Sequence, residues 1–212
     1  MMEAEKMIEK YKVVPVIKLE QVDDAVPLAE ALMEGGLPLA EITFRTDAAQ
    51  EAIRRIKRDV PQVMAGAGTL TNLEQAKRAQ DAGADFFVMP GFHRGIVEFA
   101  LEQHIPVYPG ICTPTELMMV MEYRLTVAKF FPAEAYGGIR TLKALVGPFP
   151  GIRFMPTGGI HAGNIMEYLA CPNVIACGGS WLCPAGDINE GNWAAITQRA
   201  RECMALVQEV RS

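Results

Sequence analysis

Eight short apolar segments recur along the chain at steps of about 20 to 27 residues, and stretches with helical spacing separate them. The apolar segments are rich in β-branched residues, as expected for strands that are buried on both faces. Such strands, each followed by a helix, are typical of a parallel sheet. The segments are VVPVIKL (13–19), LAEITFR (39–45), MAGAGTL (64–70), FFVMPG (86–91), PVYPGI (106–111), TVAKFFP (126–132), RFMPTGG (153–159) and VIACGGS (174–180).

The stretches between these segments carry helix patterns. In 22–34 and 47–58, apolar residues recur at the spacing of one helical face. Residue types that favour helix ends bound several predicted helices: Asp47, Asn72 and Thr113 at the starts, Gly35 and Gly83 at the ends. Pro114 and Glu116 follow Thr113, so this start has the sequence of a capping box.

Eight strand–helix units fit within 212 residues, and no stretch differs in composition as a second domain or a linker would. We therefore predict an α/β fold, a single-domain (β/α)8 TIM barrel spanning 1–212 with an N-terminal helix. The alternative is an open doubly wound sheet. That fold usually has a dominant glycine-rich loop after its first strand, whereas the first loop here reads LEQVDD (19–24).

Composition argues against several classes of protein. Residues of the types AVILMFWYC make up 50% of the chain, and 20 basic against 25 acidic side chains give a net charge of −5. This balance argues against a nucleic-acid partner or an anionic membrane surface. Because the chain has no apolar run of about 20 residues and no signal-peptide pattern, we expect a soluble, cytoplasmic protein. Five cysteines form no CxxC pair and three histidines are scattered, so we expect free thiols and no metal site.

Charged residues inside the apolar segments mark the candidate site, because a charge in a buried strand needs a compensating role. Glu41 and Arg45 lie in the second segment, Lys129 lies in the sixth, and Lys18 ends the first. Glu41 and Arg45 share one face of their strand but are about 13 Å apart at roughly 3.3 Å per residue. We expect Glu41 deeper in the barrel and Arg45 at its mouth. The alternative role for Glu41 is a buried Glu–Lys bridge that only fixes packing.

Lys129 is the candidate nucleophile. Val127 and Phe131 flank it on its own face, and an ammonium is poorly solvated among apolar side chains, which favours the free amine. A free amine is what Schiff-base chemistry on a ketone requires. Lys18 is the competing lysine, but a polar segment follows it, so we expect its side chain to reach solvent at the mouth or surface.

Two glycine doublets follow the seventh and eighth apolar segments, in TGGIHAGN (157–164) and CGGSW (177–181). Exposed backbone N–H groups in such loops can bind a phosphate. Barrels often hold phosphate in the loops after their seventh and eighth strands. These two loops are therefore the predicted phosphate site.

Taken together, the motifs resemble those of the 2-dehydro-3-deoxy-6-phosphogluconate (KDPG) aldolases, also described as 4-hydroxy-2-oxoglutarate (KHG) aldolases. The resemblance covers nearly the whole chain, and its most specific part is the ordered set EITFRT (41–46), KFFPAE (129–134) and PTGGI (156–160). It implies a class I aldolase on a (β/α)8 barrel, commonly a homotrimer. It also implies that no metal or other cofactor is needed, because the 2-oxo acid substrate forms a covalent Schiff base with a lysine.

The resemblance implies a reaction and a role for individual residues. The reaction is cleavage of KDPG to pyruvate and D-glyceraldehyde 3-phosphate, with KHG cleaved to pyruvate and glyoxylate. Lys129 resembles the Schiff-base lysine, and Glu41 resembles the general acid/base. The implied substrate-binding residues are Arg45, Thr69 and Pro90 at the pyruvyl carboxylate, Phe131, and then Thr157, Gly158, Gly159, Gly179 and Ser180 at the hydroxylated, phosphorylated end.

Several alternatives stay open on the sequence. Cys112 and His161 stand where serine is common in this family, near the mouth, which bears on substrate preference. Glu134 is a second acid after the catalytic strand; we rank it behind Glu41 as a base and expect it to order the YGG turn that follows. The alternative functions are cleavage of the C4-epimeric galactonate substrate and a non-catalytic phosphosugar-binding barrel, which would not need both Lys129 and Glu41.

Overall fold

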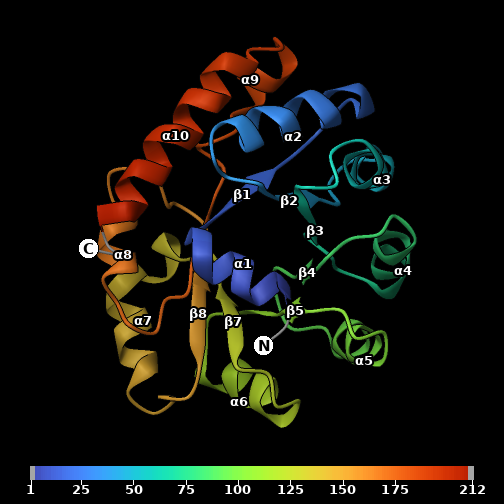
Figure 1. The fold of residues 1–212 in the computed structure, drawn as a ribbon. Coiled ribbons are helices and arrows are strands. Elements are labelled where there is room, and N and C mark those ends of the chain that lie inside the picture. The colour runs from blue at the N-terminus through green and yellow to red at the C-terminus, as the bar shows by residue number, and fades with distance from the viewer. Residues whose placement is uncertain (1–2, 210–212) are drawn as a thin grey trace.

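The computed structural model describes residues 3–209 as strands gathered at the centre with helices around them (Figure 1). Each of the eight predicted segments contains a strand, which confirms the α/β class and the alternation of strands and helices. The strands are β1 (Val13–Ile17), β2 (Leu39–Thr43), β3 (Met64–Gly68), β4 (Phe87–Val88), β5 (Val107–Tyr108), β6 (Gly110–Ile111), β7 (Val127–Phe130), β8 (Arg153–Pro156) and β9 (Cys177–Gly179).

The helices begin and end close to the predicted positions. They are α1 (Glu3–Tyr11), α2 (Ala25–Glu34), α3 (Ala49–Asp59), α4 (Leu73–Asp81), α5 (Arg94–Glu102), α6 (Pro114–Glu122), α7 (Gly138–Val146), α8 (Ile165–Leu169), α9 (Ala185–Asn189) and α10 (Trp193–Glu209), with 3-10 turns η1 (Val22–Asp24) and η2 (Glu134–Tyr136). Thr113 and Glu116 form the predicted capping box of α6, and Asn72 caps α4. The prediction of Asp47 as a cap is wrong, because the chain is still turning there and Ala48 takes the N-cap position of α3.

The strands form two parallel sheets. Six strands follow the order β5-β4-β3-β2-β1-β9 and make a half-barrel, and three follow the order β6-β7-β8. The predicted fifth strand is divided between the two sheets, so the expectation of eight continuous strands is corrected. The division falls at Pro109, which has no N–H to donate to a strand ladder. Its carbonyl oxygen accepts a hydrogen bond from the Lys129 N–H at 2.8 Å.

The predicted N-terminal helix, α1, lies across the ends at which the strands begin (Figure 1). Arg153, the first residue of β8, forms ion pairs with Glu5 and Glu9 of this helix. Ile8 of the same helix is fully buried. The C-terminal ends of the strands therefore remain for the loops that carry the predicted site.

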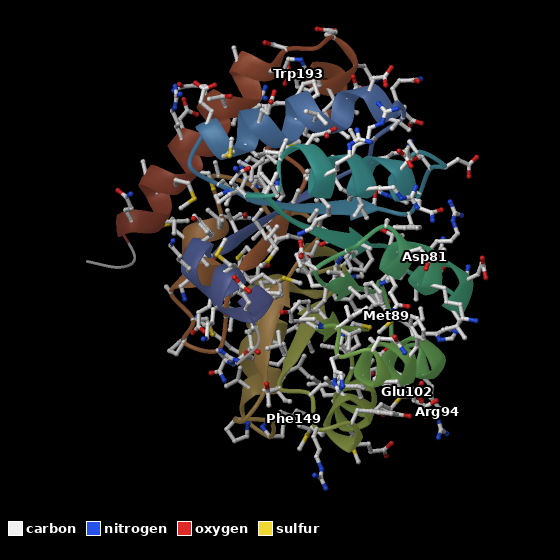
Figure 2. The ribbon with its side chains drawn as sticks, turned by 45° about the vertical axis from the view of Figure 1, so that its right-hand side comes forward. Asp81, Met89, Arg94, Glu102, Phe149 and Trp193 are labelled. Carbon is white, nitrogen blue, oxygen red and sulfur yellow. The ribbon has the colours of Figure 1, made fainter. Side chains whose placement is uncertain are left out.

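Helices cover the outer faces of the strands, which explains why the strands lack a polar alternation. Figure 2 shows Asp81, Arg94 and Glu102 on the outer helices, while Met89 after β4 lies within the molecule and is fully buried. Trp193 begins α10 beside α2 (Figure 2), and the two helices are joined where Thr197 donates to the Ala31 carbonyl oxygen at 3.0 Å.

The five cysteines are free, as predicted, and all except Cys112 are buried. Burial raises the pKa of Cys203 to about 11 and that of Cys183 to about 12, so both remain thiols at neutral pH. Within residues 3–209, no helix combines the length and apolar character needed to cross a bilayer.

Candidate active site

Buried polar side chains gather in one part of the fold. Within the described chain five polar or charged residues are buried, and four of them lie on β2, on β7 or directly after β8. These four are Glu41, Thr43, Lys129 and Thr157, and the fifth is Thr197 of α10. Buried polar groups need partners, so their concentration identifies the candidate site without reference to any motif.

Lys129 and Glu41 form a buried ion pair across the interior. The Lys129 Nζ lies 3.4 Å from Glu41 Oε1, and the side chains are 5% and 0% exposed. The Lys129 Nζ also lies 5.2 Å from the centroid of the Phe131 ring, within the range of a cation–π contact. Glu41 Oε2 is buried and accepts no hydrogen bond from any described residue. The pair thus combines a nitrogen in apolar surroundings with a carboxylate oxygen that remains open to a third group.

Gly68 makes room for the Glu41 carboxylate. It stands opposite Thr43 in the β2–β3 ladder, and a Cβ at this position would lie 2.2 Å from Glu41 Oε1. A side chain here would therefore displace the carboxylate. The GAG of the third apolar segment is the sequence signal for this role, although Gly68 was not singled out on the sequence alone.

Arg45 lies in the turn after β2, exposed at the C-terminal ends of the strands, as predicted for a residue at the mouth. Its Nε donates to Thr43 Oγ1 at 3.1 Å, and the Thr43 hydroxyl donates to the Ile17 carbonyl oxygen at 2.8 Å. The buried threonine therefore anchors the guanidinium to β1. Thr43 was given no role on the sequence alone, although it lies between Glu41 and Arg45 in the second segment.

A cavity of about 140 Å³, which we call the distal pocket, opens beside this group. Its lining brings together seven of the eleven predicted site residues: Arg45, Phe131, Thr157, Gly158, Gly159, Gly179 and Ser180. A larger cavity of about 430 Å³ adjoins it and shares Val16, Arg45 and Ser180. Lys18 lines the larger cavity, is 43% exposed and pairs with Glu20, in agreement with its predicted place at the mouth.

Thr69 and Pro90 do not line the distal pocket. Thr69 directly follows β3, and Pro90 lies two residues after the end of β4. Thr69 follows β3 with φ +56°, a left-handed conformation that is uncommon for a β-branched residue. The other described non-glycine residues with such a φ each follow the end of a helix: Lys12, His104 and Arg124. Backbone strain of this kind concentrates at functional sites. Pro90 packs against β6, since a Cβ at Gly110 would lie 2.3 Å from the Pro90 carbonyl oxygen.

Gly179 has a packing role in addition to any role in binding. A Cβ there would lie 1.5 Å from the Trp181 indole, so this glycine lets the ring pack over the backbone. Cys112 directly follows β6 and His161 lies in the loop after β8. Residues 3–209 contain no group of three or more His, Cys, Asp or Glu side chains placed to hold a metal ion.

Comparisons with known proteins agree on one family. The model of the KDPG and KHG aldolase family matches residues 4–199. The chain is 47% identical to a 2-dehydro-3-deoxy-phosphogluconate aldolase of Dickeya dadantii, with 95% of each chain covered. It is 45% identical to the KHG/KDPG aldolase of Escherichia coli, with 95% of this chain and 94% of the relative covered. Among solved structures, a KDPG aldolase of Legionella pneumophila holds pyruvate as a covalent carbinolamine intermediate; it superposes with a TM-score of 0.92 at 39% identity, covering 95% of this chain and 98% of that one.

The buried pair makes a prediction about stability. Lys129→Met should lower the free energy of unfolding by about 3 kcal/mol at pH 7, because it leaves the Glu41 carboxylate buried without a counter-charge. Adding Glu41→Gln to this variant should recover most of the loss, since no charge then remains in the interior. Urea unfolding of the wild type, both single variants and the double variant measures the effect. A double variant no more stable than Lys129→Met alone would contradict the prediction.

Proposed function

Because the chain belongs to the KDPG and KHG aldolase family, we propose that Lys129 is the residue that forms the Schiff base and that Glu41 is its general acid/base. The protein is a carbon–carbon lyase that cleaves KDPG to pyruvate and D-glyceraldehyde 3-phosphate. It works through a covalent lysine Schiff base, and the imine provides the electron sink that other aldolases obtain from a metal ion.

One observation carries the assignment of these two residues. Lys129 and Glu41 are buried together with 3.4 Å between nitrogen and oxygen, and Glu41 keeps a second buried oxygen without a partner. Transfer of one proton from the ammonium to the carboxylate leaves a neutral amine, which is the nucleophile that attack on a ketone requires. The open Oε2 is the acceptor available for a substrate hydroxyl or for a water molecule between the two.

The steps follow from this pair. The Lys129 amine attacks the C2 ketone, Glu41 returns its proton to the departing hydroxyl, and loss of water gives a protonated Schiff base with Glu41 again a carboxylate. Glu41 removes the proton of the C4 hydroxyl, the C3–C4 bond breaks, and its electrons pass into the imine to give an enamine. D-Glyceraldehyde 3-phosphate leaves. Glu41 then returns a proton to C3, and hydrolysis releases pyruvate and the free lysine.

The two ends of the substrate are assigned to different parts of the site. Arg45, anchored by Thr43, would bind the pyruvyl carboxylate together with Thr69 and Pro90 at the ends of β3 and β4. A charge-assisted contact of this kind orients the ketone carbon toward Lys129. Every 2-oxo acid substrate shares this carboxylate, so the same residues would also serve KHG, which the family cleaves to pyruvate and glyoxylate.

The distal pocket is the proposed phosphate site. Gly159, Ile160 and Ser180 line it, and their backbone N–H groups donate no hydrogen bond to another described residue. Unpaired N–H groups in glycine loops are favourable donors to phosphate oxygens. Thr157 and Gly158 complete the wall nearest β8, and Phe131 lies between the pocket and Lys129.

We also propose that the two sheets close into one (β/α)8 barrel within a single domain. Two sets of contacts support closure. At one junction β5 and β6 are neighbouring parts of one segment, and the Lys129 N–H bonds to the intervening Pro109 carbonyl. At the other, single parallel bridges join Phe154 to Val174 and Thr157 to Gly178, beside β8 and β9.

Borohydride trapping tests the Schiff-base lysine. Incubation with pyruvate and borohydride should place a stable adduct on the peptide that contains Lys129, and Lys129→Ala should abolish it. Lys18→Ala is the matched control and should still be trapped. Glu41→Gln should be trapped slowly while its cleavage rate falls by roughly 10²–10⁴, as expected on loss of a general acid/base. An adduct that persists in Lys129→Ala would move the role to another lysine.

A charge at Ser180 tests the phosphate site. Ser180→Asp should repel a bound phosphate and lower kcat/KM for KDPG by at least about tenfold, or 1.4 kcal/mol. The neutral isostere Ser180→Asn is the control. The same variants should differ little on unphosphorylated 2-dehydro-3-deoxygluconate, which lacks only the phosphate. Equal losses on the two substrates would show that the loop shapes the site without binding phosphate.

The homotrimer implied by the family resemblance is a further part of the proposal. Its support is an apolar cluster on α6, where Met118, Met119 and Met121 are exposed. Sedimentation should give the mass of three 23.2-kDa chains. Met118→Glu should then promote dissociation, whereas Met33→Glu on α2, also an exposed methionine, should not. A monomeric wild type would refute the assembly.

A further inference from the structure

Glu134 has no part in the mechanism above, yet it makes a side-chain contact across 34 residues of sequence. It lies in the exposed turn η2 after β7, and its Oε1 accepts a hydrogen bond from the Tyr168 hydroxyl on α8. Tyr168 is only 1% exposed. Burial, together with the bond to Glu134, raises the pKa of Tyr168 well above its ordinary value. The hydroxyl therefore remains a proton donor throughout the neutral range.

The side chain of Glu134 runs between two glycines with positive φ. A Cβ at Gly159 (φ +80°) would lie 2.6 Å from both Cβ and Cγ of Glu134. A Cβ at Gly138 (φ +57°) would lie 2.9 Å from both Glu134 Oε1 and Tyr168 Oη. Both positions need glycine for conformation and for space. The Glu134 stem thus packs directly on Gly159, while its carboxylate is directed to Tyr168.

The backbone on either side of this contact is joined as well. The N–H groups of Ala133 and Glu134 donate to the carbonyl oxygens of Thr157 and Gly158 at 2.8 and 3.1 Å. On the opposite side, the Asn164 Nδ2 donates to the Gly159 carbonyl oxygen at 3.0 Å. The loop after β7 therefore holds the first half of the loop after β8, and α8 holds Glu134. The loop that carries the unpaired Gly159 and Ile160 N–H groups is fixed from both faces.

We propose that Glu134 and Tyr168 are positioning residues that hold the distal pocket ready for the substrate phosphate; the inference rests on the proposed phosphate site. Two effects act together. The Glu134 stem keeps Gly159 in the conformation that presents the unpaired N–H groups. The bond to Tyr168 keeps a carboxylate, which would repel phosphate, turned away from the pocket. Neither residue lines the distal pocket, and the bond between them does not involve Lys129 or Glu41, so the chemical step itself should be insensitive to them.

Tyr168→Phe is the decisive variant, because it removes one hydroxyl and frees the Glu134 carboxylate beside the pocket. We expect the KM for KDPG to rise by at least fivefold with kcat within twofold of the wild type. The kinetics on unphosphorylated 2-dehydro-3-deoxygluconate and the rate of borohydride trapping with pyruvate should stay unchanged. A role confined to stability would lower the urea midpoint and affect both substrates alike.

Two further variants separate charge from packing. Glu134→Gln keeps the stem and a carbonyl oxygen that can accept from Tyr168, so its KM for KDPG should stay near that of the wild type. In the double variant Tyr168→Phe/Glu134→Gln the freed group is neutral, and part of the KM increase should be reversed. Tyr123→Phe is the matched control. It removes the other described tyrosine–glutamate hydrogen bond, to Glu98 at 3.0 Å on the outside of the molecule, and should leave the kinetics on both substrates unchanged.

The possible outcomes separate the positioning role of Glu134 and Tyr168 from the proposed phosphate site on which it rests. If the wild type prefers KDPG over its unphosphorylated counterpart and Tyr168→Phe reduces that preference, the positioning role is supported. If the preference survives in Tyr168→Phe and in Glu134→Ala, the positioning role is overturned while the phosphate site stands. If the wild type shows no preference for the phosphorylated substrate, the phosphate site is wrong and the positioning role is rejected with it.

Discussion

The buried contact between a lysine and a glutamate is the constraint on which the rest of the site depends. Glu41 comes from the six-stranded sheet and Lys129 from the three-stranded sheet, so their contact spans the space between the two. Moving either charge out of water alone is costly, and each offsets that cost for the other. Gly68 clears the space that the carboxylate occupies, and Phe131 covers the nitrogen. The same burial places the Lys129 nitrogen, the proposed nucleophile, beside a carboxylate that can accept its proton.

Sequence analysis could predict the features that local pattern controls. Strand–helix alternation, the α6 capping box and the charges at 41 and 129 are all visible in the order of residues. The split at Pro109 was not predicted, because the apolar pattern continues across this residue and does not reveal the missing N–H. The same limit applies to the site. A buried Glu–Lys bridge was one interpretation of Glu41, but which lysine pairs with it, across 88 residues of sequence, is a property of the tertiary fold.

Gly68, Thr43 and Tyr168 show what kind of residue escapes such analysis. Each belongs to a type that is ordinary in its element, and each acquires a role only through a neighbour distant in sequence. Gly68 leaves room for the Glu41 carboxylate, and Thr43 links Arg45 to the Ile17 carbonyl oxygen. Tyr168 donates a hydrogen bond to Glu134. The proposed reacting groups thus lie on strands, which pack rigidly, while the groups proposed to bind the far end of the substrate lie on loops. Loops accept substitution more readily, so substrate range can change while the chemistry stays fixed.

Helix α1 lies across the ends at which the strands begin, and ion pairs of Arg153 with Glu5 and Glu9 hold it there. Substrate and products therefore pass at the C-terminal ends of the strands. With Lys129 as the nucleophile, the pyruvyl fragment is bound deep and covalently, whereas the aldehyde lies nearer to solvent. Release is then compulsory in order: the aldehyde departs first and pyruvate second. In the synthetic direction pyruvate must bind first, because an aldehyde that arrives early blocks its approach to the lysine. The depth of Lys129 thus makes the binding and release of the two fragments ordered.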